Sequence, residues 1–157
     1  MNVPHYWYNI NVDLLKPLPP PIDPYETDSR IALLMRILPS ELLDQEFTPL
    51  RYVPIPEEIR ELYERMGRPT PFKRAYGLER ALGNGVRIYY KFEGALPAGS
   101  HKLNTAIPQV YYAMKDGAKE VVTETGAGQW GLAVPLAAAL LGVKATVFMT
   151  RNSYLNK

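Results

Sequence analysis

Strand-like and helix-like segments alternate along the chain after Gly67, and this alternation constrains the fold more than any other feature. Segments rich in β-branched and aromatic residues predict strands, and the longer segments between them predict helices. The predicted series is strand 86–92, helix 102–115, strand 120–123, helix 129–141 and strand 144–149. Strands separated by helices of this length are joined by right-handed crossovers. The sequence therefore predicts an α/β fold with a parallel sheet and crossover helices.

The first part of the chain is rich in proline and differs from the rest. An aromatic opening at residues 6–8 precedes five prolines between residues 17 and 24, a composition that favours extended backbone. This segment could be a ligand for a proline-binding module. We favour an arm that packs on its own domain, because isolated clusters of this kind are weak motifs.

Two helices are predicted between this arm and the α/β region. Apolar residues at helical spacing cover residues 29–38, and Pro39 should end that helix. Residues 56–66 place acids early and bases late, which suits the helix dipole. We therefore divide the chain into an extended arm with helices at residues 1–66 and an α/β domain at residues 67–157.

Composition excludes several classes of function. The net charge of +2 is spread over both signs without a basic block, so no nucleic acid is expected as a partner. The absence of cysteine excludes disulfides, thiolate catalysis and zinc sites built on sulfur, and it is compatible with a reducing cytoplasm. The longest apolar stretch, at residues 133–143, is too short to cross a bilayer, and residues 1–10 do not resemble a secretion signal. We expect a cytoplasmic protein that acts on small metabolites.

The first chemically informative motif, at residues 93–105, follows a predicted strand, where ligands bind in open α/β sheets. Most lysines are solvated surface charges, but Lys102 lies at a predicted helix start, after Gly99 for a tight turn and Ser100 as a helix N-cap. The positive end of a helix favours a neutral amine and attracts an anionic cofactor. We therefore expect a lowered pKa for Lys102 and a nucleophilic amine able to form a Schiff base with a cofactor aldehyde.

Two neighbours of this lysine have alternative interpretations. His101 could face a cofactor phosphate, act as a general acid, or only bind backbone at the helix start. The amide of Asn104 could reach a phenolic oxygen on a cofactor ring, or only satisfy the helix end.

The second motif, at residues 124–131, follows the next predicted strand. Its small residues let successive backbone N–H groups converge on an anion such as a substrate carboxylate, although a glycine-containing turn without a ligand is the more common explanation for such a sequence. The residues concerned are Thr125, Gly126, Ala127, Gly128 and Gln129. Glu124 ends a strand that we expect to be buried, and desolvation would raise its pKa into the range useful for acid and base catalysis.

Together these motifs resemble the amino-terminal part of tryptophan synthase beta chains, and more narrowly the second, longer type found mainly in archaea and some bacteria. The resemblance spans essentially the whole chain. The matching segments are residues 7–10, 18–24, 67–71, 90–94, 99–105 and 124–131. Trp130 stands where the commoner type has histidine, which is a feature of the second type.

The resemblance implies fold type II of the pyridoxal-phosphate enzymes, with residues 67–157 as an incomplete cofactor-binding domain, and the replacement of the hydroxyl of L-serine by indole. By this resemblance Lys102 holds pyridoxal 5'-phosphate and moves protons at the substrate α-carbon, and Glu124 assists loss of the serine hydroxyl. His101 lies beside the cofactor phosphate. The substrate carboxylate is bound by Thr125, Gly126, Ala127, Gly128 and Gln129. Apart from the resemblance, we expect Asn104 and Gln129 to contact the cofactor as well.

Family members continue beyond residue 157 with a phosphate-binding loop and a partner for the pyridine nitrogen, so we expect this chain to be inactive alone. A homodimer, a complementing carboxyl-terminal half and a tryptophan synthase alpha chain are the expected partners. Two alternatives remain open. One is a serine or threonine dehydratase, against which Glu124 argues; the other is a non-catalytic remnant or a module that complements a separate half.

Pro108 and Pro135 each fall inside a predicted helix. An interior proline removes a hydrogen bond and costs about 3 kcal/mol unless a kink is accommodated. A kink at Pro108 would displace the amine of Lys102, so the sequence leaves open whether this proline is tolerated or marks relaxed selection.

Overall fold

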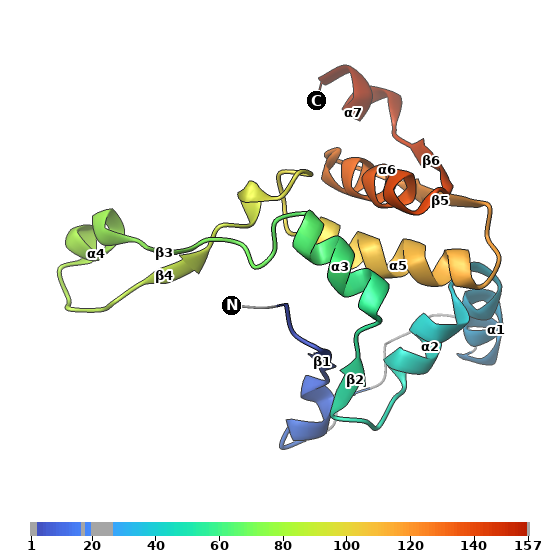
Figure 1. The fold of residues 1–157 in the computed structure, drawn as a ribbon, viewed down its shortest axis with the longest axis horizontal. Coiled ribbons are helices and arrows are strands. Elements are labelled where there is room, and N and C mark those ends of the chain that lie inside the picture. The colour runs from blue at the N-terminus through green and yellow to red at the C-terminus, as the bar shows by residue number, and fades with distance from the viewer. Residues whose placement is uncertain (1–2, 17, 20–26, 157) are drawn as a thin grey trace.

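The computed structural model describes residues 3–16, 18–19 and 27–156 of the 157-residue chain. Helices and strands are mixed along it (Figure 1). The elements are β1 (Tyr6–Tyr8), η1 (Ile10–Asp13), α1 (Thr27–Ile37), α2 (Ser40–Glu46), β2 (Tyr52–Pro54), α3 (Glu57–Arg65), β3 (Phe72–Arg74), α4 (Tyr76–Leu82), β4 (Tyr89–Lys91), η2 (Glu93–Ala95), α5 (Leu103–Lys115), β5 (Glu120–Glu124), α6 (Gln129–Leu141), β6 (Lys144–Phe148) and α7 (Arg151–Asn156).

The last third of the chain contains a strand, a helix and a parallel strand, as predicted. β5 and β6 pair in parallel from Glu120 opposite Lys144 to Glu124 opposite Phe148. Helix α6 connects the two strands and packs against both of them. The predicted bounds of these three elements agree with the structure to within one residue.

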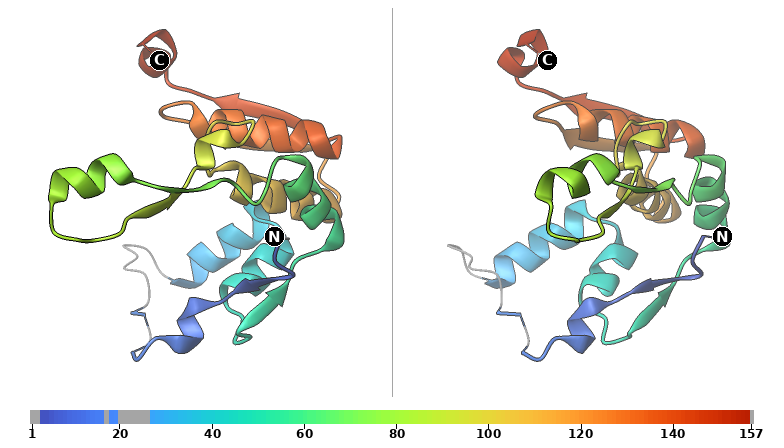
Figure 2. Two further views of the ribbon diagram at one scale, coloured as in Figure 1. Left: turned by 60° about the vertical axis from the view of Figure 1, so that its left-hand side comes forward. Right: turned by 90° about the vertical axis from the view of Figure 1, so that its left-hand side faces the viewer.

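The predicted strand at residues 86–92 does not join this sheet, so that part of the sheet prediction is wrong for the described residues. Only β4 forms there, and it pairs antiparallel with β3 in a hairpin that projects from the rest of the molecule (Figures 1 and 2). Glu79 of the connecting helix α4 explains this pairing. It accepts the N–H of Ile88 at 2.7 Å and forms an ion pair with Arg74 at 2.9 Å, which ties both strands to α4.

Helix α5 lies between α3 and α6 and is at the centre of the core (Figure 1). Ile59 of α3 and Ile107 of α5 are almost fully buried, as is Leu103 in the first turn of α5. At the other end of α5, Asp116 accepts hydrogen bonds from the backbone N–H and the hydroxyl of Ser40, at 2.6 and 3.0 Å, and so attaches α2 to this helix.

The amino-terminal segment contributes to the same core. Val3 is buried, and β1 pairs antiparallel with β2, from Tyr6 opposite Pro54 to Tyr8 opposite Tyr52. Residues 20–26, which include much of the predicted proline-rich arm, lie outside the described residues. The division of the chain at residue 66 stays a prediction.

Neither interior proline ends its helix. α5 continues through Pro108, and α6 continues through Pro135, each over 13 residues. The predicted helix at residues 29–38 corresponds to α1 and the one at residues 56–66 to α3.

Candidate functional site

Lys102 occupies the N-cap position of α5, one residue before the helix begins. Gly99 has a φ of +65°, so the predicted tight turn is present. The N-cap was predicted at Ser100, but it lies two residues later, at Lys102. The buried Ser100 hydroxyl instead accepts the N–H of Lys102 at 3.4 Å.

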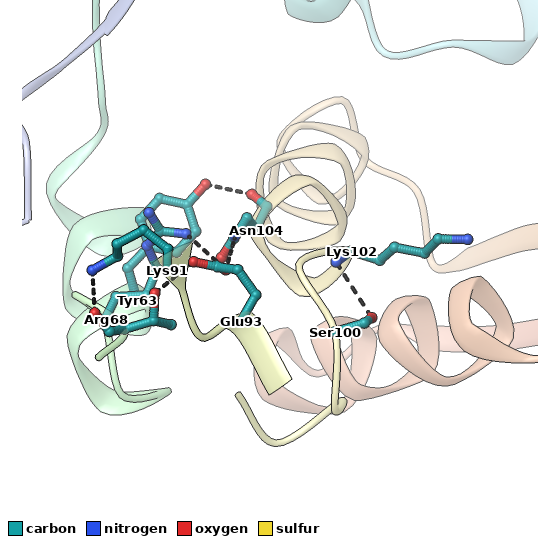
Figure 3. Close-up of polar contacts among 8 residues, drawn as sticks. Tyr63, Arg68, Lys91, Glu93, Ser100, Lys102 and Asn104 are labelled. Carbon is teal, nitrogen blue, oxygen red and sulfur yellow. Dashed lines mark hydrogen bonds and ion pairs between the residues drawn. The ribbon is translucent and has the colours of Figure 1, made fainter. Parts of the chain in front are cut away.

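The side chain of Lys102 is half-buried and extends away from the other polar residues at the start of α5 (Figure 3). Within residues 3–16, 18–19 and 27–156, its ammonium group has no carboxylate within ion-pairing distance. The amine is therefore not held by an acid of the described chain.

Asn104 points in the opposite direction and is held by Glu93 (Figure 3). Its amide Nδ2 donates to Glu93 Oε2 at 2.8 Å. In this structure the partner of the Asn104 amide is Glu93. The predicted contact of this amide with a cofactor ring stays a prediction. His101 has an exposed side chain, and its carbonyl accepts the N–H of Asn104 at 3.0 Å.

Glu93 is the centre of a polar network that the sequence did not predict. Thr70 Oγ1 donates to Glu93 Oε1 at 2.5 Å, and Arg68 Nη1 lies 3.8 Å from Glu93 Oε2. Partial burial favours the protonated carboxyl, but the hydrogen bonds from Thr70 and Asn104 and the charge of Arg68 outweigh it and lower the pKa of Glu93. Glu93 is therefore an ionised anchor beside the first turn of α5.

Tyr63 of α3 completes this network. Its hydroxyl donates to the backbone carbonyl of Asn104 at 2.5 Å. The side chain is 5% exposed, and burial raises the pKa of Tyr63 to about 12. Segments 67–71 and 90–94 of the family resemblance contain Arg68, Thr70 and Glu93, but nothing in the local sequence predicts a contact between Tyr63 and Asn104.

The loop after β5 is organised by the hydroxyl of Thr125. This buried side chain accepts the N–H groups of Gly128 at 3.2 Å and of Gly131 at 3.1 Å. Gly128 has a φ of +99°, a conformation that glycine adopts readily at the start of α6. The Thr125 hydroxyl therefore holds the turn in shape.

Four other N–H groups of this turn and of the first turn of α6 have no hydrogen-bond acceptor in the part of the chain that the structure describes. They belong to Gly126, Ala127, Gln129 and Trp130. Gly126, Ala127 and Gln129 are exposed, and nothing lies within 4 Å of a Cβ built on Gly126. Exposed donors at a helix start can bind a carboxylate or a phosphate.

Glu124 is exposed at the end of β5, so the prediction of a buried carboxylate is wrong in this structure. The strand alternates between exposed and half-buried residues, and Glu124 falls on the exposed face. Trp130 is fixed nearby, since its indole Nε1 donates to Thr123 Oγ1 at 2.8 Å.

The two motifs lie on the same side of the molecule. α5 and α6 pack against each other, and both begin at the same end of this pair (Figures 1 and 2). Lys102 precedes one of these helix starts and the loop at residues 124–128 precedes the other. The fold thus places an amine and a set of N–H donors near one edge of the structure.

The described residues contain neither a membrane-spanning helix nor a cluster of metal ligands. None of the described helices has the length and apolar character needed to cross a membrane. Residues 3–16, 18–19 and 27–156 contain no group of three or more histidine, aspartate or glutamate side chains that could hold a metal ion.

Comparison with known proteins identifies the family. The family model described as "Pyridoxal-phosphate dependent enzyme" matches residues 63–155, which is more than half of the chain. The chain belongs to this family. Its members depend on pyridoxal phosphate, and the matched residues contain Lys102 and the loop at residues 124–128.

Tryptophan synthase beta chains are similar to this chain over nearly its whole length. The one from Pyrobaculum islandicum is 71% identical over 151 residues, which are 96% of this chain and 36% of the relative. Those from Aeropyrum pernix, beta chain 1, and from Pyrococcus horikoshii are 61% and 56% identical, with 100% and 99% of this chain covered and 38% and 34% of the relatives. The chain spans about a third of the length of these relatives.

The residues present fit the cofactor. Lys102 offers an amine without an acidic partner in the described residues, which suits covalent attachment of an aldehyde. The exposed N–H groups at the start of α6 suit an anionic group of the substrate or the cofactor.

Proposed function

We propose that this chain supplies the lysine and the carboxylate-binding loop of a pyridoxal-phosphate site that makes L-tryptophan from L-serine and indole. The observation that carries the proposal is the position of Lys102, free of acidic partners in the described chain, on the same side as the exposed N–H groups after β5. The similarity to tryptophan synthase beta chains indicates the reaction.

Each residue has a role in this proposal. Lys102 holds the cofactor and moves a proton at the substrate α-carbon, while the N–H groups of residues 125–129 orient the serine carboxylate. The exposed Glu124 protonates the departing hydroxyl, and His101 lies toward the cofactor phosphate, with Asn104 and Gln129 as further cofactor contacts. When bound, pyridoxal phosphate stabilises negative charge at the α-carbon.

The remaining parts of the proposal concern the complete protein. Since the chain spans about a third of the length of its relatives, we propose that groups outside it complete the site and that it does not convert serine alone. We further propose fold type II, a cytoplasmic location, and assembly as a homodimer, with an alpha chain, or with a complementing carboxyl-terminal half.

The test is a titration of the purified chain with pyridoxal phosphate, followed by absorbance in the visible range. Borohydride then makes the lysine linkage permanent, and peptide mapping identifies the labelled residue. We expect saturable labelling at Lys102 that is lost in Lys102→Ala and kept in Lys119→Ala, which removes an exposed lysine elsewhere. Diffuse labelling of many lysines would contradict the proposal and favour the non-catalytic alternative.

The reaction itself is tested with a complementing carboxyl-terminal half of a relative. Tryptophan formed from serine and indole supports the proposal, whereas an oxo acid formed from serine without tryptophan would indicate the dehydratase alternative.

A further inference from the structure

Pro108 leaves one backbone carbonyl of α5 without its usual partner. In an α-helix the N–H of each residue donates to the carbonyl four residues earlier, and proline has no N–H. The carbonyl affected by Pro108 belongs to Asn104, in the first turn of α5. Asn104 is half-buried, and a carbonyl that is partly removed from water is stabilised by a replacement donor.

The hydroxyl of Tyr63 is that replacement. It donates to the carbonyl of Asn104 at 2.5 Å from α3, 41 residues earlier in the chain. Tyr63 is 5% exposed, so the core around α3 holds its ring in place for this contact. Pro108 is therefore compensated by a specific contact between two helices.

Asn104 is also held through its side chain. Glu93 accepts a hydrogen bond from the Asn104 amide at 2.8 Å. Glu93 in turn accepts a hydrogen bond from Thr70 and lies near Arg68. The first turn of α5 is thus fixed at the main chain and at the side chain of a single residue (Figure 3).

Fixing Asn104 also fixes the direction of Lys102. Residues two positions apart in a helix are related by a rotation of about 200° about the helix axis, so Lys102 and Asn104 project from opposite sides of this turn. The buried Leu103 lies between them, and the carbonyl of Lys102 accepts the N–H of Ala106 at 3.0 Å. A turn that rotates at Asn104 must therefore move Lys102.

We propose that Tyr63 is a positioning residue of the pyridoxal-phosphate site: its hydroxyl replaces the N–H that Pro108 lacks, and so orients the turn that carries Lys102. This inference rests on the proposed function. It adds a residue from α3, outside both sequence motifs, to the groups that determine how Lys102 meets the cofactor.

The test combines Tyr63→Phe with Pro108→Ala. Tyr63→Phe removes one hydroxyl, and we expect about a tenfold weaker affinity for pyridoxal phosphate at Lys102, from the visible titration and borohydride mapping. Pro108→Ala restores an N–H for the Asn104 carbonyl. In that background the same Tyr63→Phe change is expected to weaken affinity by less than about twofold.

Tyr112→Phe is the matched control, because Tyr112 is a buried tyrosine near the other end of α5. Its hydroxyl accepts a hydrogen bond from Gln45 at 3.1 Å. We expect this variant to lose stability without a change in affinity at Lys102. Two results would overturn the proposal. One is equal cofactor affinity in wild type and Tyr63→Phe. The other is a loss of affinity from Tyr63→Phe that is as large in the Pro108→Ala background as in the wild-type background.

Hydrogen exchange supplies a readout that does not need the cofactor. We expect the amides of residues 104–107 to exchange about tenfold faster in Tyr63→Phe than in wild type, and to be unchanged in Tyr112→Phe. If the wild type fails to label at Lys102, the proposed function fails, and exchange still tests the anchor. If the wild type labels and Tyr63→Phe matches it, only this inference fails.

A second variant covers the case in which Tyr63→Phe does not fold. Glu93→Gln loosens the side-chain anchor of the same Asn104 and leaves Tyr63 in place. We expect about threefold weaker affinity at Lys102. Glu120→Gln is the control, because Glu120, like Glu93, accepts a threonine hydroxyl and pairs with a basic side chain, but lies on β5. Unchanged affinity in Glu93→Gln would count against the anchor.

Discussion

Gly131 lies where the loop after β5 leaves no room for a side chain, which makes Gly131→Ala a direct test of this packing. A Cβ at this position would lie 2.6 Å from Thr125 Cγ2, 3.0 Å from Thr125 Cβ and 3.0 Å from Val147 Cγ1. The Thr125 side chain cannot adopt another rotamer without losing the hydrogen bonds that its hydroxyl accepts from the N–H groups of Gly128 and Gly131. The substitution should therefore disturb both the core and the loop.

The expected loss of stability is about 2 kcal/mol. Overpacking costs about 1 to 3 kcal/mol, and a weakened hydrogen bond adds about 1 kcal/mol. Replacing a helical glycine by alanine returns about 1 kcal/mol of helix propensity. For a chain of this size the net loss corresponds to a melting temperature lower by about 4 to 8 °C.

Thermal melting followed by circular dichroism, with urea unfolding, measures this loss. The control is Gly77→Ala in α4, where nothing lies within 4 Å of an added Cβ, and where a gain of up to about 1 kcal/mol is expected. A Gly131→Ala protein as stable as wild type, beside a normal Gly77→Ala, would refute the packing argument.

Two further predictions concern the polar groups of the site. Thr125→Val keeps the shape of the side chain but removes the acceptor of two N–H groups, so we expect about 2 kcal/mol lower stability by urea unfolding; no loss would contradict the role of the hydroxyl. Glu93 has a pKa below its ordinary value of 4.5, because its hydrogen bonds and Arg68 outweigh the opposing effect of burial. Its contribution to stability is therefore fully present above that value and is lost as the pH falls through the lower folded-state pKa. Melting temperatures in this acidic range should fall less steeply in Glu93→Gln than in wild type, and identical slopes would count against the network.

The local parts of the fold could be predicted from the sequence. β5, α6 and β6 each have a clear composition, so their order and parallel pairing follow from rules about neighbouring elements. The same reasoning located Lys102 and the loop after β5 at the starts of helices. These features depend on residues that lie close together in the chain.

The pairing of β4 could not be predicted in the same way. Its composition indicates a strand, but its partner is selected by Arg74 and Glu79 in the hairpin, through contacts that composition does not reveal. Glu124 was misjudged for a related reason. Its burial was inferred from the apolar residues of β5, yet alternation along the strand places it on the exposed face.

Pro108 shows most clearly how a local rule depends on distant residues. Taken alone, an interior proline predicts a broken or kinked helix and a displaced lysine, but Tyr63 satisfies the carbonyl that the proline leaves open. Because the two residues are on different helices, only the packing of α3 on α5 brings them together. An ordinary helix would hold its first turn with its own N–H groups, whereas in our proposal the proline makes the orientation of Lys102 depend on α3. In our proposal, this dependence connects the amine of Lys102 to the core of the protein.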